Sequence, residues 1–101
     1  MDRAKIEQII AAGESETVEF KTSFNAKVIE TLVAFANFEG GKVFIGVSDN
    51  GNITGVSISS ESIQSWLNEI KSKTEPSIIP EFKKYEIDGK SIVIILCNQM
   101  S

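Results

Sequence analysis

The sequence predicts a single-domain α/β (α+β) fold, in which a mixed β-sheet packs against helices in the order α-β-α-β-β-α-β-β. Three stripes of apolar residues at helical spacing alternate with strand-like runs. Asn-Gly and Asp-Gly pairs mark tight turns between strands. The 101 residues suffice for one hydrophobic core, and the 42% hydrophobic and 24% charged shares are ordinary for a globular domain. We therefore expect one domain over residues 1–101.

The first part of the chain predicts two helices with a strand between them. Residues 2–12 carry an apolar stripe at helical spacing, Asp2 suits the N-cap, and Gly13 suits the stop. Residues 17–21 alternate between polar and apolar, as in a half-buried strand. Residues 26–37 carry a wide apolar stripe, which predicts a helix that lies on a sheet.

The middle of the chain predicts a hairpin. The glycines at 40–41 break the second helix, and residues 42–48 form a mostly apolar strand that we expect in the centre of the sheet. Residues 49–52 contain Asn-Gly, which favours a type I′ turn. A short strand over residues 53–56 is expected to return beside the first one.

The last part predicts a helix and a second hairpin. Ser59 or Ser60 caps a helix whose apolar residues repeat every three to four positions. Residues 82–87 and 91–97 are strands joined by the Asp-Gly pair at 88–89. The final strand is apolar almost throughout, so we expect it to lie centrally in the sheet.

Composition excludes several classes of site. The chain has no histidine and one cysteine, so it has neither a Cys/His zinc site, nor an internal disulfide, nor a His-based triad. With no apolar run of membrane-spanning length and a polar N-terminus, the sequence predicts a cytoplasmic protein without a membrane partner. The net charge of −4 disfavours nucleic-acid binding by the overall charge of the protein. Any such binding would depend on local groups of lysines.

The Gly-Gly-Lys run at residues 40–42 does not indicate a phosphate-binding loop. A Walker loop joins a strand to the helix that it opens, with Ser or Thr after the lysine. Here the glycines follow a helix and lead into a strand, and Val43 follows the lysine. We expect these glycines to turn the chain from helix to sheet.

Three carboxylates form a candidate metal site. Glu14 lies at the entrance of the first strand, Glu19 within it, and Asp49 at the end of the predicted central strand. If these strands are neighbours, the carboxylates meet at one edge and hold Mg²⁺ or Mn²⁺, which activates water for phosphodiester cleavage. The alternative is local, because Asp49 also suits the first position of a turn and Glu14 suits a loop.

Lysines and aromatic residues form a second candidate site. Lys83, Lys84 and Tyr85 follow one another on a predicted edge strand that suits a nucleic-acid backbone, although a solvated face is the commoner outcome. Lys21 lies on the predicted strand over residues 17–21, and Lys42 on the one over residues 42–48. Trp66 belongs to a helical apolar stripe, so we expect it to pack in the core rather than to stack on a base.

Four blocks of the sequence resemble the Schlafen/AlbA-like family of domains, which are assigned to DNA binding in transcriptional regulators and RecG-helicase-related proteins. The blocks are Gly-Glu-Ser-Glu-Thr-Val-Glu-Phe-Lys at 13–21, Ile-Glu-Thr-Leu-Val-Ala-Phe-Ala-Asn at 29–37, Gly-Gly at 40–41, and the run from Phe44 to Gly51 that closes with Ile-Thr-Gly-Val at 53–56. They occur in the family's order and spacing. Residues beyond 56 agree with the family in pattern rather than in motif.

The resemblance implies a DNA- or RNA-binding domain at the N-terminal part of a longer protein, with a C-terminal regulatory region. Lys21, Lys42, Lys83, Lys84 and Tyr85 would contact the nucleic acid.

In Schlafen relatives two glutamates spaced as Glu14 and Glu19, with a later aspartate best matched by Asp49, form a ribonuclease site. A divalent-metal ribonuclease is therefore one alternative function, although the balance favours a non-enzymatic domain. A protein-interaction module that forms homodimers is another alternative.

Overall fold

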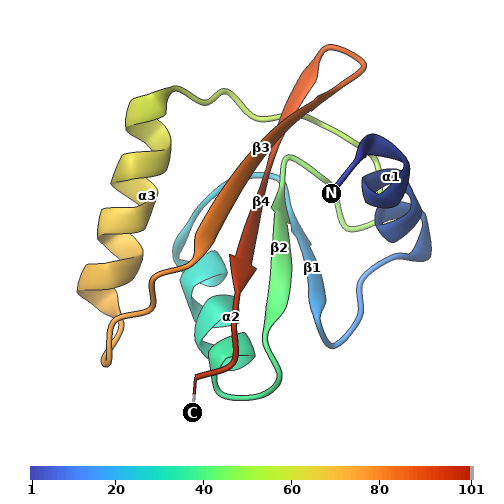
Figure 1. The fold of residues 1–101 in the computed structure, drawn as a ribbon. Coiled ribbons are helices and arrows are strands. Elements are labelled where there is room, and N and C mark those ends of the chain that lie inside the picture. Colours follow the sequence, from blue (N-terminus) through green and yellow to red (C-terminus); the bar gives the residue numbers. More distant parts are fainter. Residues whose placement is uncertain (101) are drawn as a thin grey trace.

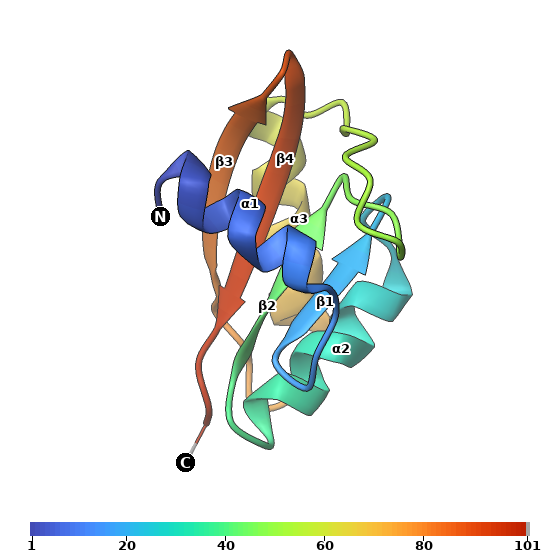
Figure 2. The same cartoon turned by 90° about the vertical axis from the view of Figure 1, so that its right-hand side faces the viewer.

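Residues 1–100, which the computed structural model describes, form three helices and one four-stranded mixed sheet (Figure 1). In chain order the elements are α1 (Arg3–Ala12), β1 (Val18–Lys21), α2 (Ala26–Ala36), β2 (Gly41–Ile45), α3 (Ser60–Lys73), β3 (Glu81–Ile87) and β4 (Lys90–Cys97). Helix α1 lies on one face of the sheet, and α2 and α3 lie on the other (Figure 2). The predicted fold class is thus confirmed.

The sheet has the order β1-β2-β4-β3, with β1 parallel to β2 and the other two pairings antiparallel. Helix α2 makes the crossover that a parallel pair requires. Strands β2 and β4 both have neighbours on either side, which confirms their predicted central positions. Their side chains are accordingly buried on both faces, from Val43 to Ile45 and from Ile92 to Ile95.

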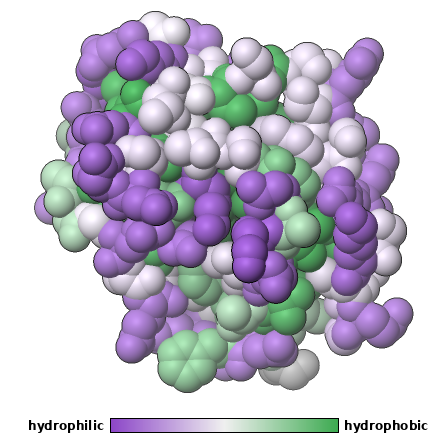
Figure 3. Space-filling model, turned by 180° about the vertical axis from the view of Figure 1, so that it is seen from behind, coloured by the Kyte–Doolittle hydropathy of each residue, from purple (hydrophilic) through white to green (hydrophobic). Residues whose placement is uncertain are grey.

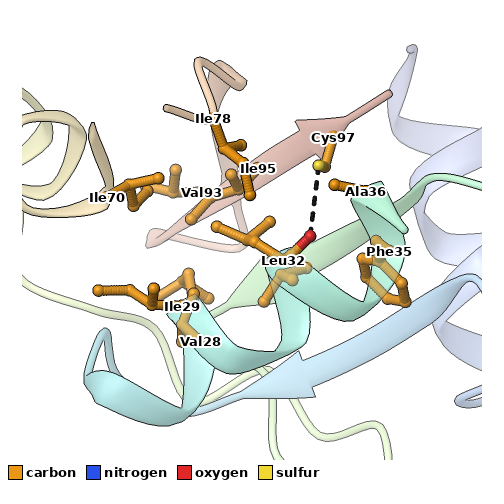
Figure 4. Packing of buried hydrophobic residues seen from close by; sticks show 12 residues of the cluster. Val28, Ile29, Leu32, Phe35, Ala36, Ile70, Ile78, Val93, Ile95 and Cys97 are labelled. Atoms are coloured by element: carbon orange, nitrogen blue, oxygen red, sulfur yellow. Dashed lines mark hydrogen bonds between the residues drawn. The ribbon is translucent and has the colours of Figure 1, made fainter. Parts of the chain in front are cut away.

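Two hydrophobic layers flank the sheet. On the α2 and α3 side, Leu32, Ile70 and Ile78 pack against Val93 and Ile95 (Figure 4).

On the α1 side, Ile6 and Ile10 cover Phe20 and Phe44, whose rings meet edge to face with centroids 5.7 Å apart. The two layers share the central strands, because successive residues of a strand point to opposite faces.

The predicted helix caps are confirmed. The Asp2 carboxylate accepts a hydrogen bond from the Lys5 N–H at 2.9 Å, and Gly13 ends α1 at a φ of 87°. Ser59 caps α3 and forms a reciprocal capping box with Ser62. Trp66 of α3 packs half-buried against the core, stacked on Phe24, as expected.

The predicted short strand over residues 53–56 is wrong, and the observed order is α-β-α-β-α-β-β. Of that strand only a single bridge forms, between Val47 and Ile53. Both edges of β2 are already occupied, by β1 and β4, so no edge of β2 is free for residues 53–56.

The two turns differ. Gly51 donates to the Ser48 carbonyl at 2.9 Å, so the central residues of this turn are Asp49 and Asn50. Neither has a positive φ, and the predicted type I′ turn is wrong there. At the second hairpin, Asp88 and Gly89 both have positive φ, which is the geometry of a type I′ turn.

No helix within residues 1–100 is long and apolar enough to cross a membrane, and the 14-residue α3 is the longest of them.

Candidate functional site

Glu14 and Glu19 lie side by side at the β1 edge of the sheet. A tight turn brings them together, because Ser15 donates to the Val18 carbonyl at 2.9 Å and folds the chain back along β1. The Glu14 carboxylate then accepts the N–H of Phe20 at 3.0 Å. The Phe20 N–H belongs to β1, the edge strand, and has no neighbouring strand to accept it. Glu14 therefore supplies the acceptor for this backbone donor.

The two carboxylates have opposite pKa shifts. A hydrogen bond from the Glu19 carboxyl, followed by the one from the Phe20 N–H, lowers the pKa of Glu14. Partial burial, followed by the hydrogen bond and the negative charge of Glu14, raises the pKa of Glu19. The Lys21 ammonium, 3.6 Å from the Glu19 carboxylate, offsets part of this rise.

A divalent cation would fit this pair of carboxylates, because it would relieve their mutual repulsion with the oxygen ligands that Mg²⁺ and Mn²⁺ prefer. Asp49 does not join them. Glu19 is paired with Val43 in β2. Asp49 lies in the turn beyond Ile45, where β2 ends, and is therefore further along the sheet. Within residues 1–100, no three acidic or Cys side chains gather closely enough to hold a metal ion. The three-carboxylate site stays a prediction, of which the structure brings two members together.

The predicted nucleic-acid residues divide between the two faces of the sheet. Lys42 and Lys83 are in register with Leu96 and Ile94 on the α1 side, and Tyr85 shares that side. Lys21 and Lys84 are in register with Ile45 and Val93 on the α2 and α3 side. Neighbouring residues of one strand point apart, so Lys83 and Lys84 do not form one patch.

One end of the α1 side is free of helix. Val18, Lys42, Leu96 and Glu81 form a row across the four strands there, and Lys83 lies two residues further along β3. We call these five residues the open sheet end. They are half-buried or exposed, whereas Phe44 and Ile94 beneath α1 are fully buried. In Figure 2, α1 crosses the sheet and leaves the strand ends near the C-terminus uncovered.

Ion pairs occupy some of these lysines. Lys83 pairs with Glu81 at 3.0 Å, and Lys21 pairs with Glu19. Lys42 and Lys84 make no ion pair within the described part of the chain. The Tyr85 hydroxyl accepts a hydrogen bond from the N-terminal ammonium at 3.2 Å. Lys42 is therefore the cation of the open sheet end that is not already paired.

A family model places the chain among known proteins. The model for Schlafen AlbA_2 domains matches residues 14–101. The chain belongs to the Schlafen AlbA_2 family. In this AlbA_2 domain the match begins at Glu14 of the carboxylate pair, and α1 precedes the matched residues. No curated protein matches the sequence.

Two solved structures share the fold of this AlbA_2 domain. One is the N-terminal domain of a protein related to the ATP-dependent DNA helicase RecG, from Nitrosomonas europaea. It has a TM-score of 0.78 at 20% identity, over 100% of this chain and 76% of that one. The other is the DIP2311 protein of Corynebacterium diphtheriae, with a TM-score of 0.73 at 16% identity, over 97% of this chain. The AlbA_2 domain spans only 22% of that second chain.

Lys90 has no role in the sequence-based prediction, although the structure fixes its side chain. Its ammonium donates to the Ile53 carbonyl at 3.2 Å, across the loop that follows β2. The sequence shows only that a lysine directly follows the Asp-Gly turn. It does not show the contact itself, because the two residues are 37 positions apart in the chain.

Proposed function

We propose that this chain is a nucleic-acid-binding domain, and that the open sheet end contacts the phosphate backbone. Lys42 carries the proposal, because it is a cation on an uncovered part of the sheet without an ion pair in residues 1–100. Membership of the AlbA_2 family and the likeness to a domain of a RecG-related protein support a role with nucleic acid.

The geometry of the open sheet end suits contact with the phosphate backbone of one nucleic-acid strand better than recognition of base edges. Lys42 and Lys83 are two strands and two residues apart, so their Cα atoms are about 12 Å from each other, and their flexible side chains can reach phosphates of one strand. Leu96 lies between them and offers an apolar surface. Glu81 competes with a phosphate for Lys83, and the net charge is −4, so we expect weak binding that is strongest at low salt.

The test is fluorescence anisotropy with labelled single- and double-stranded DNA and RNA, at low and moderate salt. Lys42→Gln should weaken binding and reduce the slope of log affinity against log salt by about 0.7–0.9, the contribution of one phosphate contact. Lys71→Gln is the matched control, since Lys71 is an exposed lysine near the end of α3 with no ion pair in the part that the structure describes. Absence of binding at low salt, or equal losses in the two variants, would overturn the proposal.

The Glu14–Glu19 pair favours a second candidate, a divalent-metal ribonuclease. Two adjacent carboxylates of opposite pKa shift are the arrangement from which metal-binding and acid–base sites are built. The same titrations with Mn²⁺, followed by electrophoresis of the probe, separate the two functions. A nuclease would cleave RNA only with the metal, and Glu19→Gln would abolish cleavage without abolishing binding.

A further inference from the structure

A hollow of about 460 Å³ lies at the other end of the sheet, between the loop after β2 and the tip of the β3–β4 hairpin. In Figure 2 this loop and the hairpin tip meet at the end of the molecule away from the C-terminus. The hollow lies apart from the open sheet end, because Ser91 and Leu96 are five residues apart on β4, or about 17 Å. Its lining residues are Thr54, Gly55, Val56, Ser57, Ile58, Gly89, Lys90 and Ser91.

Hydrogen-bond donors dominate this lining. Thr54, Ser57 and Ser91 contribute hydroxyls, and Lys90 contributes an ammonium. Among the described residues that line the hollow, none has a carboxylate. The nearest acid along the chain, Asp88, is engaged by Arg3 at 2.8 Å. Glu86 lies opposite Ser91 in register and is the acid that would oppose an anion here.

Lys90 is held in place over the loop. Its ammonium donates to the Ile53 carbonyl, and its aliphatic stem lies against Gly55. A methyl group at Gly55 would come within 3.1 Å of Lys90 Cβ, and the φ of Gly55 is +78°, so the close approach depends on glycine. The Val56 N–H donates to the Ser91 carbonyl at 2.9 Å and ties the opposite walls together.

A lysine that is held by a carbonyl instead of a carboxylate keeps its full charge for an anion. Because the hydrogen bond to Ile53 already restrains its side chain, less rotamer entropy is lost when a ligand binds. The hollow is shallow and largely open to solvent, and its volume exceeds that of a bare anion.

We propose that this hollow binds a phosphate group carried by a nucleotide or by the end of an oligonucleotide, with Lys90 and the hydroxyls of Thr54, Ser57 and Ser91 as donors. The site does not depend on Lys42 or on the proposed backbone contacts.

The first experiment is a titration of the ¹⁵N-labelled protein with inorganic phosphate, followed by amide chemical shifts, against sodium chloride at equal ionic strength. We expect saturable shifts, weak and in the millimolar range, confined to residues 54–58 and 89–91. Lys90→Gln should weaken binding at least tenfold, and Lys71→Gln, at an exposed lysine of α3, should leave it unchanged.

A second variant tests the hollow without removing the lysine. Ser57→Glu places a carboxylate in the exposed lining and should repel phosphate while Lys90 stays. The proposal would be overturned if the shifts did not saturate, or if they spread to the other lysines. It would equally be overturned if Lys90→Gln or Ser57→Glu bound phosphate as tightly as the wild type does. Lys42→Gln is expected to lose the proposed backbone contact, whereas the shifts of residues 54–58 and 89–91 report the hollow alone. Failure of this site and failure of the proposed function are therefore separate results.

Two pairs of ligands distinguish whether the phosphate belongs to a free nucleotide or to the end of an oligonucleotide. A nucleoside 5′-monophosphate is compared with its nucleoside, and a short 5′-phosphorylated oligonucleotide with its 5′-hydroxyl form. A preference for the monophosphate supports a free-nucleotide site, and a preference for the phosphorylated oligonucleotide supports recognition of an end. Equal binding with and without the phosphate in both pairs would contradict the assignment.

Discussion

Glu14 and Glu19 show how two identical side chains acquire different properties from their surroundings. Glu14 is exposed and accepts the Phe20 N–H, so its charged form is stabilised in the fold. Glu19 is partly buried beside Glu14, so its charged form is disfavoured. Stability from Glu14 is therefore present above its usual pKa and lost as the pH falls. The ionised Glu19 has the opposite effect, since its folded pKa lies above the usual value of 4.5.

Glu19→Gln should therefore stabilise the protein at pH 7. Ionisation of Glu19 costs stability as the pH rises from 4.5 through its raised folded pKa, and glutamine removes this cost while it still donates to Glu14. We expect a higher unfolding midpoint at pH 7 and no gain well below pH 4.5, measured by circular dichroism. Glu16→Gln, at an exposed position in the same turn, is the control. A lower midpoint at pH 7 would mean that the Lys21 ion pair outweighs the repulsion.

The helices are fastened to the sheet by side chains at their ends as well as by their apolar faces. The start of α1 is tied to the β3–β4 turn by the Arg3–Asp88 ion pair, and Ile6 is fully buried beneath it. At α3, the capping box of Ser59 and Ser62 satisfies donors of the first turn. Each of the three helices thus follows an N-cap residue whose side chain accepts an otherwise free backbone N–H.

Ser59→Ala should cost about 1 kcal/mol of unfolding free energy, the usual loss of an N-cap serine. Ser60→Ala is the matched control, because Ser60 is the first helical residue and does not serve as the cap, and its effect should stay within about 0.5 kcal/mol. Urea unfolding measures both values. A larger loss from Ser60→Ala than from Ser59→Ala would contradict the cap assignment.

At the scale of the molecule, the two hydrophobic layers meet at β4. Ile94 belongs to the layer beneath α1, and Ile95 to the layer beneath α2 and α3. Seen from behind, the surface is a mixture of hydrophilic and hydrophobic residues (Figure 3). The largest fully buried side chains all belong to the two layers. We expect the layers to unfold together, because neither has a sheet of its own.

Ile94→Ala and Ile95→Ala should each lower the unfolding free energy by about 2–5 kcal/mol, the range for deletion of a buried isoleucine side chain. Trp66 lies on the α3 side, so its fluorescence reports one layer and circular dichroism reports the whole molecule. Both probes should shift together in Ile94→Ala, and a Trp66 transition that stays unchanged would show that the layers are independent. Ile79→Ala, at a side chain that is 71% exposed, is the control.

Short-range chemistry made much of the fold predictable. Asp2 and Ser59 are caps because their side chains reach the next turn, and Asp88-Gly89 forms its turn because both residues tolerate positive φ. The continuous apolar run of β4 predicted its central place, because only a strand covered on both faces has no polar side. These properties depend on neighbours in the chain, so the sequence by itself determined them.

Tertiary structure decided how distant segments share space. Residues 53–56 form no strand because β1 and β4 already occupy the edges of β2. Register placed Lys42 and Lys83 on one face and Lys21 and Lys84 on the other. A local turn brought Glu14 to Glu19, whereas Asp49, beyond the end of β2, did not join them. The Lys90 contact across Gly55 joins distant segments of the chain. Competition for strand edges and the register between strands are long-range outcomes, and a local pattern of residues carries no information about which one prevails.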